Sequence, residues 1–543
     1  MRSINILPIA SGAIALLIFA PVLALMYESF FSAAALNDDT FQDLAQTVLF
    51  DYLANSLQVV LGTLIFACLF AVAPAWWCAR YEFKGRRILQ WAMVFPLAIP
   101  AYVSADAYTE ALDYAGPIQT ALRGFFEWHS PSDYWFFDIR SITGASLMLA
   151  LALYPYIYIL MRNGFANQND HLEHAGRLLG ANERRIFFKI RLPLARPALA
   201  IGCTLVAMES LADFGTVHLF AISTLTTAIY DSWLVYGSLS TAAKISCLLL
   251  LFVVSLSWLE RKQRESQKHY DLKGSHKLTK KVASAKQKLI IWLVCLSIIS
   301  LGFVVPVLTL ISYNLDYLTE NLNGNLWLHA QHTFTLAACA GVICTALALL
   351  FNANQRFFPR KLHASQQNIA SIGYAIPGTV LAIAILIPLG AMDLGLNALL
   401  ESWNMDSVGL ILSGSSFALL MAFVIRFAAI ANGSVLSAYE HIPPNLDAAA
   451  RSLNTHSWRL FKTIHLPLIT PATISALLLV FIECVKELPA AILLRPFNFE
   501  TLSTYVYQFA SDEQLEHGAL GALLIITVSL IPIFVLSRTQ KMS

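Results

Sequence analysis

Apolar residues occur along this chain in long blocks that are separated by short polar segments. Twelve blocks approach the length of about 20 residues that an α-helix needs to cross a bilayer. They lie near residues 6–27, 53–79, 88–112, 142–161, 197–222, 243–259, 288–313, 331–352, 367–391, 407–431, 471–494 and 517–537. The pattern predicts an all-α membrane protein with about 12 transmembrane helices. The third and ninth blocks contain Pro100 and Pro377, so we expect these two helices to be kinked or broken.

The composition agrees with this prediction. The chain has 543 residues, of which 57% are hydrophobic and 13% are charged, whereas soluble domains carry about 25% charged residues. The first block exceeds the apolar core of about 7–15 residues found in signal peptides, so we expect it to remain as the first span. The eight cysteines lie in or beside apolar blocks, without a Cys-x-x-Cys pair. This placement indicates buried apolar positions rather than redox or metal sites.

The polar segments alternate in charge. Lysine and arginine concentrate in segments 79–87, 162–196, 260–288 and 353–366, and the segments between the other spans are acidic or nearly neutral. Basic loops stay on the cytoplasmic side of a membrane. We therefore expect a multi-pass protein whose N-terminus and C-terminus are both cytoplasmic.

The chain also contains an internal repeat. The stretch "HLEHAGRLLGANERRIFFKIRLPLARPAL" at 171–199 aligns with "NLDAAARSLNTHSWRLFKTIHLPLITPAT" at 445–473 at an offset of 274, with twelve identical positions between 172 and 198. The repeat predicts two six-span halves of the same orientation. We place the halves at residues 1–259 and 289–543, joined by a basic cytoplasmic linker at 260–288. Parallel repeats imply a pseudo-twofold axis along the membrane normal and a pathway between the halves.

Each repeated stretch has the pattern of a short helix–turn–helix outside the bilayer. Gly180 suits the turn because glycine accepts a positive φ at little cost, and Asn454 takes its place in the second copy. The second helix leads to Pro193 or Pro467, where the chain enters the next span. The apolar face of such an element needs a partner. We expect two helices that dock on two copies of a cytosolic protein; the alternative is an ordinary interfacial helix.

The pattern resembles the EAA loop of binding-protein-dependent ABC importer permeases, approximately E-A-A-x-x-x-G-x(9)-I-x-L-P. The copies lie at about 171–197 and about 445–471. His174 and Ala448 replace the family glutamate, and Glu173 and Asp447 carry an acid one residue earlier. The resemblance implies that these loops couple the permease to an ATPase. The residues that it marks are Glu173, Ala175, Arg177, Gly180 and Pro193 in the first copy, and Asp447, Ala449, Arg451, Asn454 and Pro467 in the second.

The resemblance covers essentially the whole chain and implies a type I ABC importer permease fold in a bacterial inner membrane. It also implies two copies of a cytosolic ATPase below the permease and a solute-binding protein above it. The chain has no G-x-x-x-x-G-K-[ST] loop, so we expect a transport subunit that is not an enzyme and binds no cofactor. ATP and Mg would then be used by the partner ATPase, and no nucleic acid is expected as a partner.

Several acidic residues fall inside predicted spans, where charges are costly and usually functional. Span five carries one pair at i,i+4 and span eleven carries the aligned pair, so each pair is expected on one side of a helix. The four residues are Glu209, Asp213, Glu483 and Glu487. Four hard oxygen ligands suit a hard cation, and these acids are candidates for the substrate path and for transient binding of ferric iron. The alternative is pairing within the protein, for example with Lys486.

Longer stretches resemble the ferric-iron permeases, which work with a periplasmic ferric-binding protein. They include "FPLAIPAYVSADAYTEALDYAGPIQ" at 95–119 and "MESLADFGTVHLF" at 208–220. In the first stretch, Asp106 is a further candidate for the substrate path. Arg426, near the inner end of span ten, is expected to snorkel. Thiamine, polyamine and aminoethylphosphonate permeases remain alternatives, and a secondary transporter driven by an ion gradient is an alternative of another class.

Overall fold

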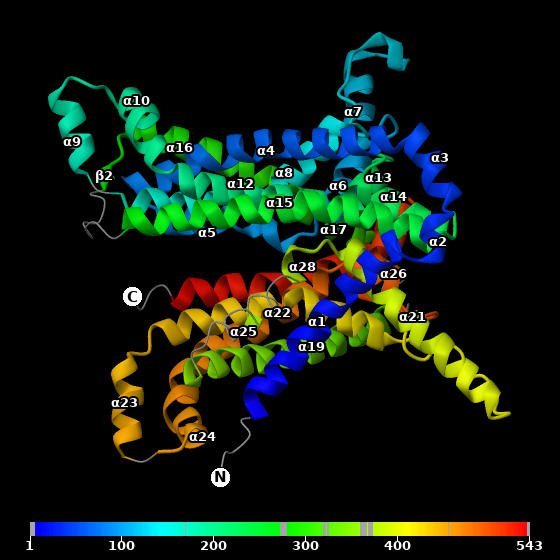
Figure 1. Ribbon diagram of the computed structural model, residues 1–543. Coiled ribbons are helices and arrows are strands. Elements are labelled where there is room, and N and C mark those ends of the chain that lie inside the picture. The colour runs from blue at the N-terminus through cyan, green and yellow to red at the C-terminus, as the bar shows by residue number, and fades with distance from the viewer. Residues whose placement is uncertain are drawn as a thin grey trace. The chain divides into compact units, whose positions relative to one another are not determined.

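In a computed structural model the chain consists almost entirely of helices (Figure 1). The structure describes residues 6–168, 170–271, 280–318, 322, 325–358, 366–367, 373–453 and 455–539. Among these residues, nine helices are long and apolar enough to cross a membrane, and two helix pairs pass the same test together but are bent by 88° and 67°. A shorter apolar helix occupies Leu515–Ile531. These segments correspond one to one with the expected spans, which confirms the all-α fold.

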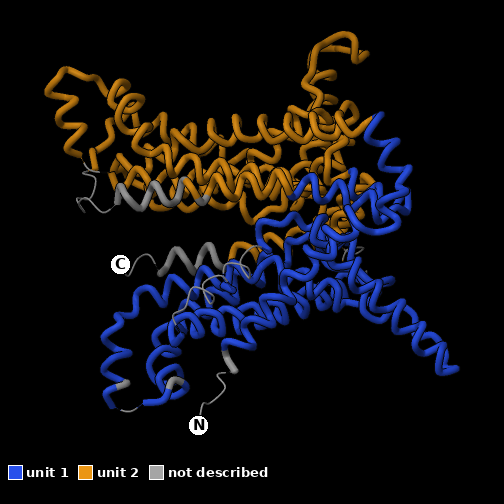
Figure 2. The backbone as a smooth tube through the Cα atoms, viewed as in Figure 1, with its two compact units in different colours: residues 1–47, 228–250, 323–505 blue, residues 48–227, 251–322, 506–543 orange. Residues whose placement is uncertain are grey.

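The helices form two compact units, which Figure 2 shows in different colours. Unit 1 comprises residues 1–47, 228–250 and 323–505, and unit 2 comprises residues 48–227, 251–322 and 506–543. The central spans of the second half lie in unit 1, and those of the first half lie in unit 2. Each unit also contains the first span of the other half. Each compact unit therefore contains spans from both halves of the sequence.

Unit 2 is built around three mutually packed helices, α4 (Leu49–Arg80), α8 (Ile142–Ala166) and α12 (Arg196–Ala212). Glycines permit their close approach. A Cβ at Gly62 would lie 2.5 Å from Ser146 Oγ, and a Cβ at Gly202 would lie 3.0 Å from Ile157 Cα. Small residues at such contacts let helix backbones pack closely in a membrane.

The other elements of the first half that come after α4 follow in chain order. They are β1 (Tyr81–Glu82), α5 (Arg86–Ala92), a 3₁₀ helix (Phe95–Ala98), α6 (Ala101–Leu112), α7 (Pro117–Phe126), a 3₁₀ turn (Pro131–Asp133), α9 (His171–Leu178), α10 (Glu183–Ile186), a π-helix (Phe187–Arg191), α11 (Leu192–Leu194), α13 (Gly215–Leu219), α14 (Leu225–Leu234) and α15 (Leu239–Asp271). Most of α14 and the start of α15 belong to unit 1. Unit 2 holds β2 (Lys281–Val282), α16 (Ala285–Ile299), a π-helix (Ser300–Val304), α17 (Val305–Asp316) and α28 (Leu515–Thr539). Since α15 extends to Asp271, part of the expected linker is helical.

Unit 1 repeats the three-helix arrangement with α19 (Leu326–Phe357), α22 (Ser416–Glu440) and α25 (Leu466–Lys486), which pack against one another. The first span, α1 (Ile6–Phe30), packs on α19 and on α21 (Gly378–Ser402). The other elements are α2 (Ala33–Leu36), α3 (Asp39–Thr47), a 3₁₀ turn (Gly373–Ala375), α23 (Pro444–Ser452), α24 (Ser457–Leu460), a π-helix (Phe461–His465), α26 (Pro489–Leu494) and α27 (Leu502–Ser511), which continues into unit 2.

The spans break at the two expected prolines and at two places that were not expected. Pro100 and Pro377 immediately precede α6 and α21, each after a 3₁₀ turn. The fifth and eleventh spans, expected to run to 222 and 494, instead end at Ala212 and Lys486. The chain turns there, because the next residue, Asp213 or Glu487, has an extended backbone, and a new short helix begins two residues later.

We expect Gly202→Val to lower the stability of the bundle by about 1–3 kcal/mol, because the added side chain meets the backbone of α8. Thermal unfolding in detergent measures this effect. Gly124→Val is the control, since a Cβ at Gly124 has open space around it. Equal melting temperatures for the two variants would contradict the tight contact.

Candidate functional site

The repeated stretch of the first half forms the expected helix–turn–helix, which we call the first helical loop (residues 171–194). Helices α9 and α10 are joined by a turn in which Gly180 has a φ of +78°. The Asn182 side chain caps α10 by accepting a hydrogen bond from the Arg185 backbone at 2.9 Å. A π-helix follows, and Pro193 lies in the short helix that leads to α12. The turn at Gly180 therefore has the backbone conformation that the sequence predicted.

The second helical loop (residues 444–465) has the same order of elements. Helix α23 precedes α24, a π-helix at 461–465 follows, and Pro467 lies in the first turn of α25. The two π-helices are offset by 274 residues, so the repeat extends to local backbone geometry. Asn454 and the side chain of Arg451 lie outside the described residues.

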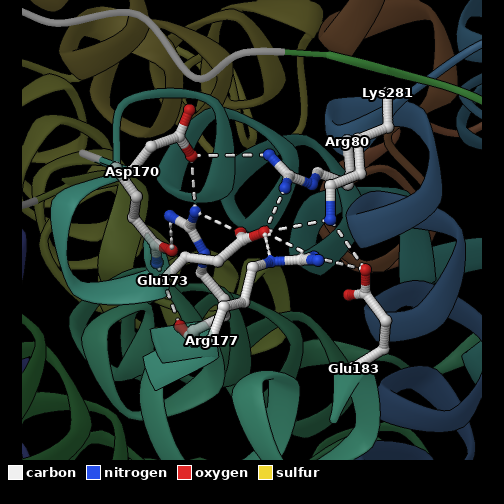
Figure 3. A network of polar contacts seen from close by, with 8 residues as sticks. Arg80, Asp170, Glu173, Arg177, Glu183 and Lys281 are labelled. Carbon is white, nitrogen blue, oxygen red and sulfur yellow. Dashed lines mark hydrogen bonds and ion pairs between the residues drawn. The ribbon is translucent and has the colours of Figure 1, made fainter. Parts of the chain in front are cut away.

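The first loop is anchored by the carboxylate of Glu173, which is 1% exposed (Figure 3). Two arginines that are almost fully buried bind it. Arg191 donates to Glu173 Oε2 at 2.6 Å, and Arg80, from the end of α4, donates to Oε1. Both arginines also donate to Asp170 Oδ1, at 2.6 and 3.4 Å. Buried ions of opposite charge compensate one another here, so the start of α9 is fixed to the end of α4.

Three further groups form the partly exposed rim of this network. Arg177 donates to Glu173 at 2.9 Å and also to Glu183 on α10. Lys281, from β2, lies 3.1 Å from Glu173 Oε1 and 2.7 Å from Glu183 Oε1. The rim therefore ties α9 to α10 and ties both helices to the segment that joins the two halves.

Asp447 occupies the equivalent place in the second loop. Arg356, near the end of α19, donates to Asp447 Oδ2 at 2.6 Å, and His465 Nε2 lies 2.8 Å from Oδ1. His465 aligns with Arg191, is fully buried, and stacks on Phe357. Burial raises the pKa of Asp447, but hydrogen bonds from Arg356 and His465 outweigh it and hold the pKa below its usual value. Both halves thus anchor the loop through one buried acid.

Glu173 and Asp447 therefore hold the loops from inside, and other residues form the outer surface. Ala175 and Ala449 are exposed. Large apolar side chains lie beside them, and the most exposed are Leu178 (90%), Leu179 (85%), Leu453 (80%) and Trp458 (73%). Sequence reasoning missed Trp458 and the anchoring bases Arg80, Arg191, Arg356, His465 and Lys281. A signal was present, because 191 and 465 are aligned basic positions and 80 and 356 are arginines near the ends of equivalent spans.

The intramembrane acids of span five do not share a helix face. Helix α12 ends before Asp213, which accepts hydrogen bonds from the backbone of Thr216 at 3.0 Å and of Val217 at 3.2 Å. Its own carbonyl accepts a hydrogen bond from Thr226 Oγ1 at 2.7 Å. The Asp213 carboxylate thus accepts hydrogen bonds from the first turn of α13, whose N-cap is Phe214. The i,i+4 relation to Glu209 holds in the sequence but not on a continuous helix.

Span eleven breaks in the same way. The carboxylate of Glu487 accepts a hydrogen bond from the backbone of Ala490 at 3.3 Å, and its carbonyl accepts one from Ser503 at 2.7 Å. Arg426 Nε lies 3.4 Å from Glu487 Oε2. Arg426 is only 7% exposed, so the expectation that it snorkels is wrong: it binds an acid inside unit 1.

Two other candidates for the substrate path are Glu483 and Asp106. Glu483 pairs with Lys486 at 3.1 Å, as the alternative of internal pairing predicts. Asp106 lies in α6 and is 8% exposed. Within the part of the chain that the structure describes, no three His, Cys, Asp or Glu residues are arranged to hold a metal ion. The proposed metal ligands Glu209, Asp213, Glu483 and Glu487 thus do not form a coordination site there.

Comparison with known proteins assigns the chain to a family. The model of the family described as "binding-protein-dependent transport system inner membrane component" matches twice, over residues 71–265 and 345–541. The chain belongs to this family. It is therefore a multi-pass inner-membrane permease made of two fused halves, and each match contains one helical loop.

Individual relatives match over different lengths. The Fe(3+)-transport system permease protein FbpB 2 of Haemophilus influenzae is 25% identical over 90% of this chain and 90% of its own length. The ferric transport system permease protein FbpB of Actinobacillus pleuropneumoniae is 22% identical over 95% of this chain and 75% of its own length. The molybdenum transport system permease protein ModB of Escherichia coli is 29% identical, over 39% of this chain and 93% of its own length.

We expect Glu173→Gln to destabilise the first loop by about 3–5 kcal/mol, because it leaves the buried Arg80 and Arg191 to share the single counter-charge of Asp170. Limited proteolysis within residues 171–194 measures this loss. Glu183→Gln is the control: that carboxylate is 49% exposed, and its loss is expected to cost less than about 1 kcal/mol. If both variants resist protease equally, Glu173 is not the anchor.

The second loop gives a prediction for pH. Because the folded pKa of Asp447 is lowered, its contribution to stability is complete above the unfolded value of about 3.9 and is lost as the pH falls through the lowered value. We expect the stability difference between wild type and Asp447→Asn to be constant from about pH 5 to 8 and to shrink below about pH 4. Unfolding curves across this range measure it.

Proposed function

We propose that this chain is the membrane permease of an ATP-driven importer for ferric iron. A periplasmic ferric-binding protein would deliver the solute, and a cytosolic ATPase would supply the energy. The observation that carries the proposal is the pair of helical loops. Each loop is locked to the permease by a buried acid and presents exposed leucines outward, which is the arrangement needed to transmit force from a partner.

The ATPase is proposed from the outer surfaces of these loops. Leu178 and Leu179 in the first loop and Leu453 in the second are exposed to 80–90%. Lipid cannot cover these side chains, because the loops are too highly charged to enter the bilayer. Apolar side chains that protrude from a rigid base are suited to fill pockets on another protein. Two loops imply two ATPase copies, which would bind ATP and Mg. The loops and both termini would then face the cytoplasm.

Ferric iron is proposed from the extent of the similarity. The relatives named as ferric permeases match over 90–95% of this chain and therefore over both fused halves. The molybdenum permease matches over 39% of the chain, which supports the shared permease fold rather than the solute. The polar candidates along the path are Asp106, Glu209 and Glu483, whereas the carboxylates of Asp213 and Glu487 accept hydrogen bonds from the first turns of short helices.

The proposed mechanism follows from the anchoring. ATP binding would bring the two ATPases together and displace both loops. Because Glu173 and Asp447 fix the loops to the ends of α4 and α19, the displacement would move whole spans rather than the loops alone. The halves would then alternate between outward and inward access.

The test is uptake of radioactive ferric iron by proteoliposomes that contain the permease, its ATPase and the loaded binding protein. We expect the double variant Leu178→Glu/Leu453→Glu to lower ATP-dependent uptake by about tenfold or more, because it places charges at the centre of both docking surfaces. Leu36→Glu is the matched control, since Leu36 is 72% exposed and lies outside the loops.

Each outcome separates the alternatives. Uptake that is driven by an ion gradient in the absence of any ATPase would show a secondary transporter and contradict the proposal. ATP-driven uptake of molybdate or thiamine without uptake of ferric iron would keep the permease mechanism and replace the solute.

A further inference from the structure

The segment that joins the two halves is fixed at one point beside the first helical loop. Strand β2 pairs in parallel with β1, with Lys281 opposite Tyr81. The backbone N–H of Ala283 donates to the Glu82 carbonyl at 3.2 Å. Since β1 directly follows α4, this short ladder holds the joining segment at the helix end to which the loop is also anchored.

The side chain of Lys281 then reaches both helices of the loop (Figure 3). Its Nζ lies 3.1 Å from Glu173 on α9 and 2.7 Å from Glu183 on α10. The two helices are connected by the turn at Gly180, around which no atoms would contact an added Cβ. A cation that bridges both helices therefore helps to set the angle between them.

The joining segment continues from this point into the first span of the second half without a flexible spacer. Ser284, two residues after β2 ends at Val282, is the N-cap of α16. Its hydroxyl accepts a hydrogen bond from the Gln287 backbone at 3.3 Å, and the Gln287 side chain accepts one from the Ser284 backbone at 3.0 Å. A displacement of the first loop can therefore pass through Lys281 and β2 into α16.

The second loop is held by its own half. The ion-pair partners of Asp447 are Arg356, from α19, and His465, from the π-helix of the same loop. The segment between the halves occurs once in the chain, and its residue Lys281 contacts the first loop. Among the residues that the structure describes, the two loops of the fused chain therefore have unequal attachments.

We propose that Lys281 is a positioning residue for coupling. Through Lys281, the first loop would move the first span of the second half as well as the spans of its own half. The inference rests on the proposed ATP-driven transport. In each cycle, movement of the first loop would displace α16 through Lys281, whereas the second loop would act on its own spans. The first loop would therefore carry more of the coupling between ATP hydrolysis and solute movement.

The network can lose Lys281 and still fold. Four cations face three carboxylates in it: Arg80, Arg177, Arg191 and Lys281 face Asp170, Glu173 and Glu183. Lys281 lies at the rim with 32% of its side chain exposed, where an ion pair contributes little to stability. Lys281→Ala therefore removes the link to the joining segment and leaves the buried anchor in place.

The first test is hydrogen exchange of the full permease–ATPase complex. In Lys281→Ala we expect exchange in residues 171–194 to accelerate by about 2- to 5-fold, the range that a partly exposed ion pair produces. The second loop, residues 444–465, is the internal control and is expected to stay unchanged. Lys280→Ala is the matched variant, because Lys280 is 44% exposed and lies 3.5 Å from Glu82. Wild-type exchange in the first loop of Lys281→Ala would overturn the proposal.

The second test measures ferric iron transported per ATP hydrolysed. We expect this ratio to fall by about 2- to 5-fold in Lys281→Ala, with ATP hydrolysis retained, and Lys281→Arg to restore it because the charge is kept. A wild-type ratio, even with faster exchange, would show a merely structural contact and overturn the coupling role. If the wild-type complex carries no ferric iron, the proposed solute fails, and the exchange comparison still decides whether Lys281 holds the loop.

Discussion

One buried carboxylate organises the end of the first half that carries the first helical loop. Glu173 brings together the end of α4, the start of α9, the π-helix that precedes α12, and the segment that leads into α16. The two arginines that bind it also bind Asp170. Removing the acid or one of the bases alone would leave a buried charge incompletely balanced, which is costly. The loop is consequently part of the rigid bundle, although most of its surface is exposed.

The second half reaches the same result with a smaller set of charges. Asp447 replaces Glu173 and a histidine replaces Arg191, while the arginine at the end of the preceding span is kept. The identity of the basic partner differs, but its position relative to the π-helix does not. The geometry common to both halves is therefore an acid on the first loop helix held between the end of one span and the beginning of another.

Much of the architecture could be predicted from the sequence because its signals are local. Block length and charge alternation predicted the spans, and the repeat predicted both helical loops with their turn at Gly180. Long-range pairing carried no local signal. The matching arginines at 80 and 356 mark equivalent span ends, but nothing near Glu173 indicates that Arg80, more than ninety positions away, is its partner. The breaks at Asp213 and Glu487 were missed for another reason. An acid inside an apolar run has the same appearance whether it lines a pathway or caps a helix, and only the backbone path distinguishes the two.

The two π-helices, at 187–191 and 461–465, have a consequence for how loop and span are oriented. A π-turn accommodates one residue more than an α-turn, and one residue corresponds to a rotation of about 100° around a helix axis. Side chains before and after each bulge thus follow different angular registers. The exposed face that carries Trp458, before the second bulge, is therefore rotated relative to the face that α25 packs against its neighbours, so a change in the loop surface need not change the packing of the span.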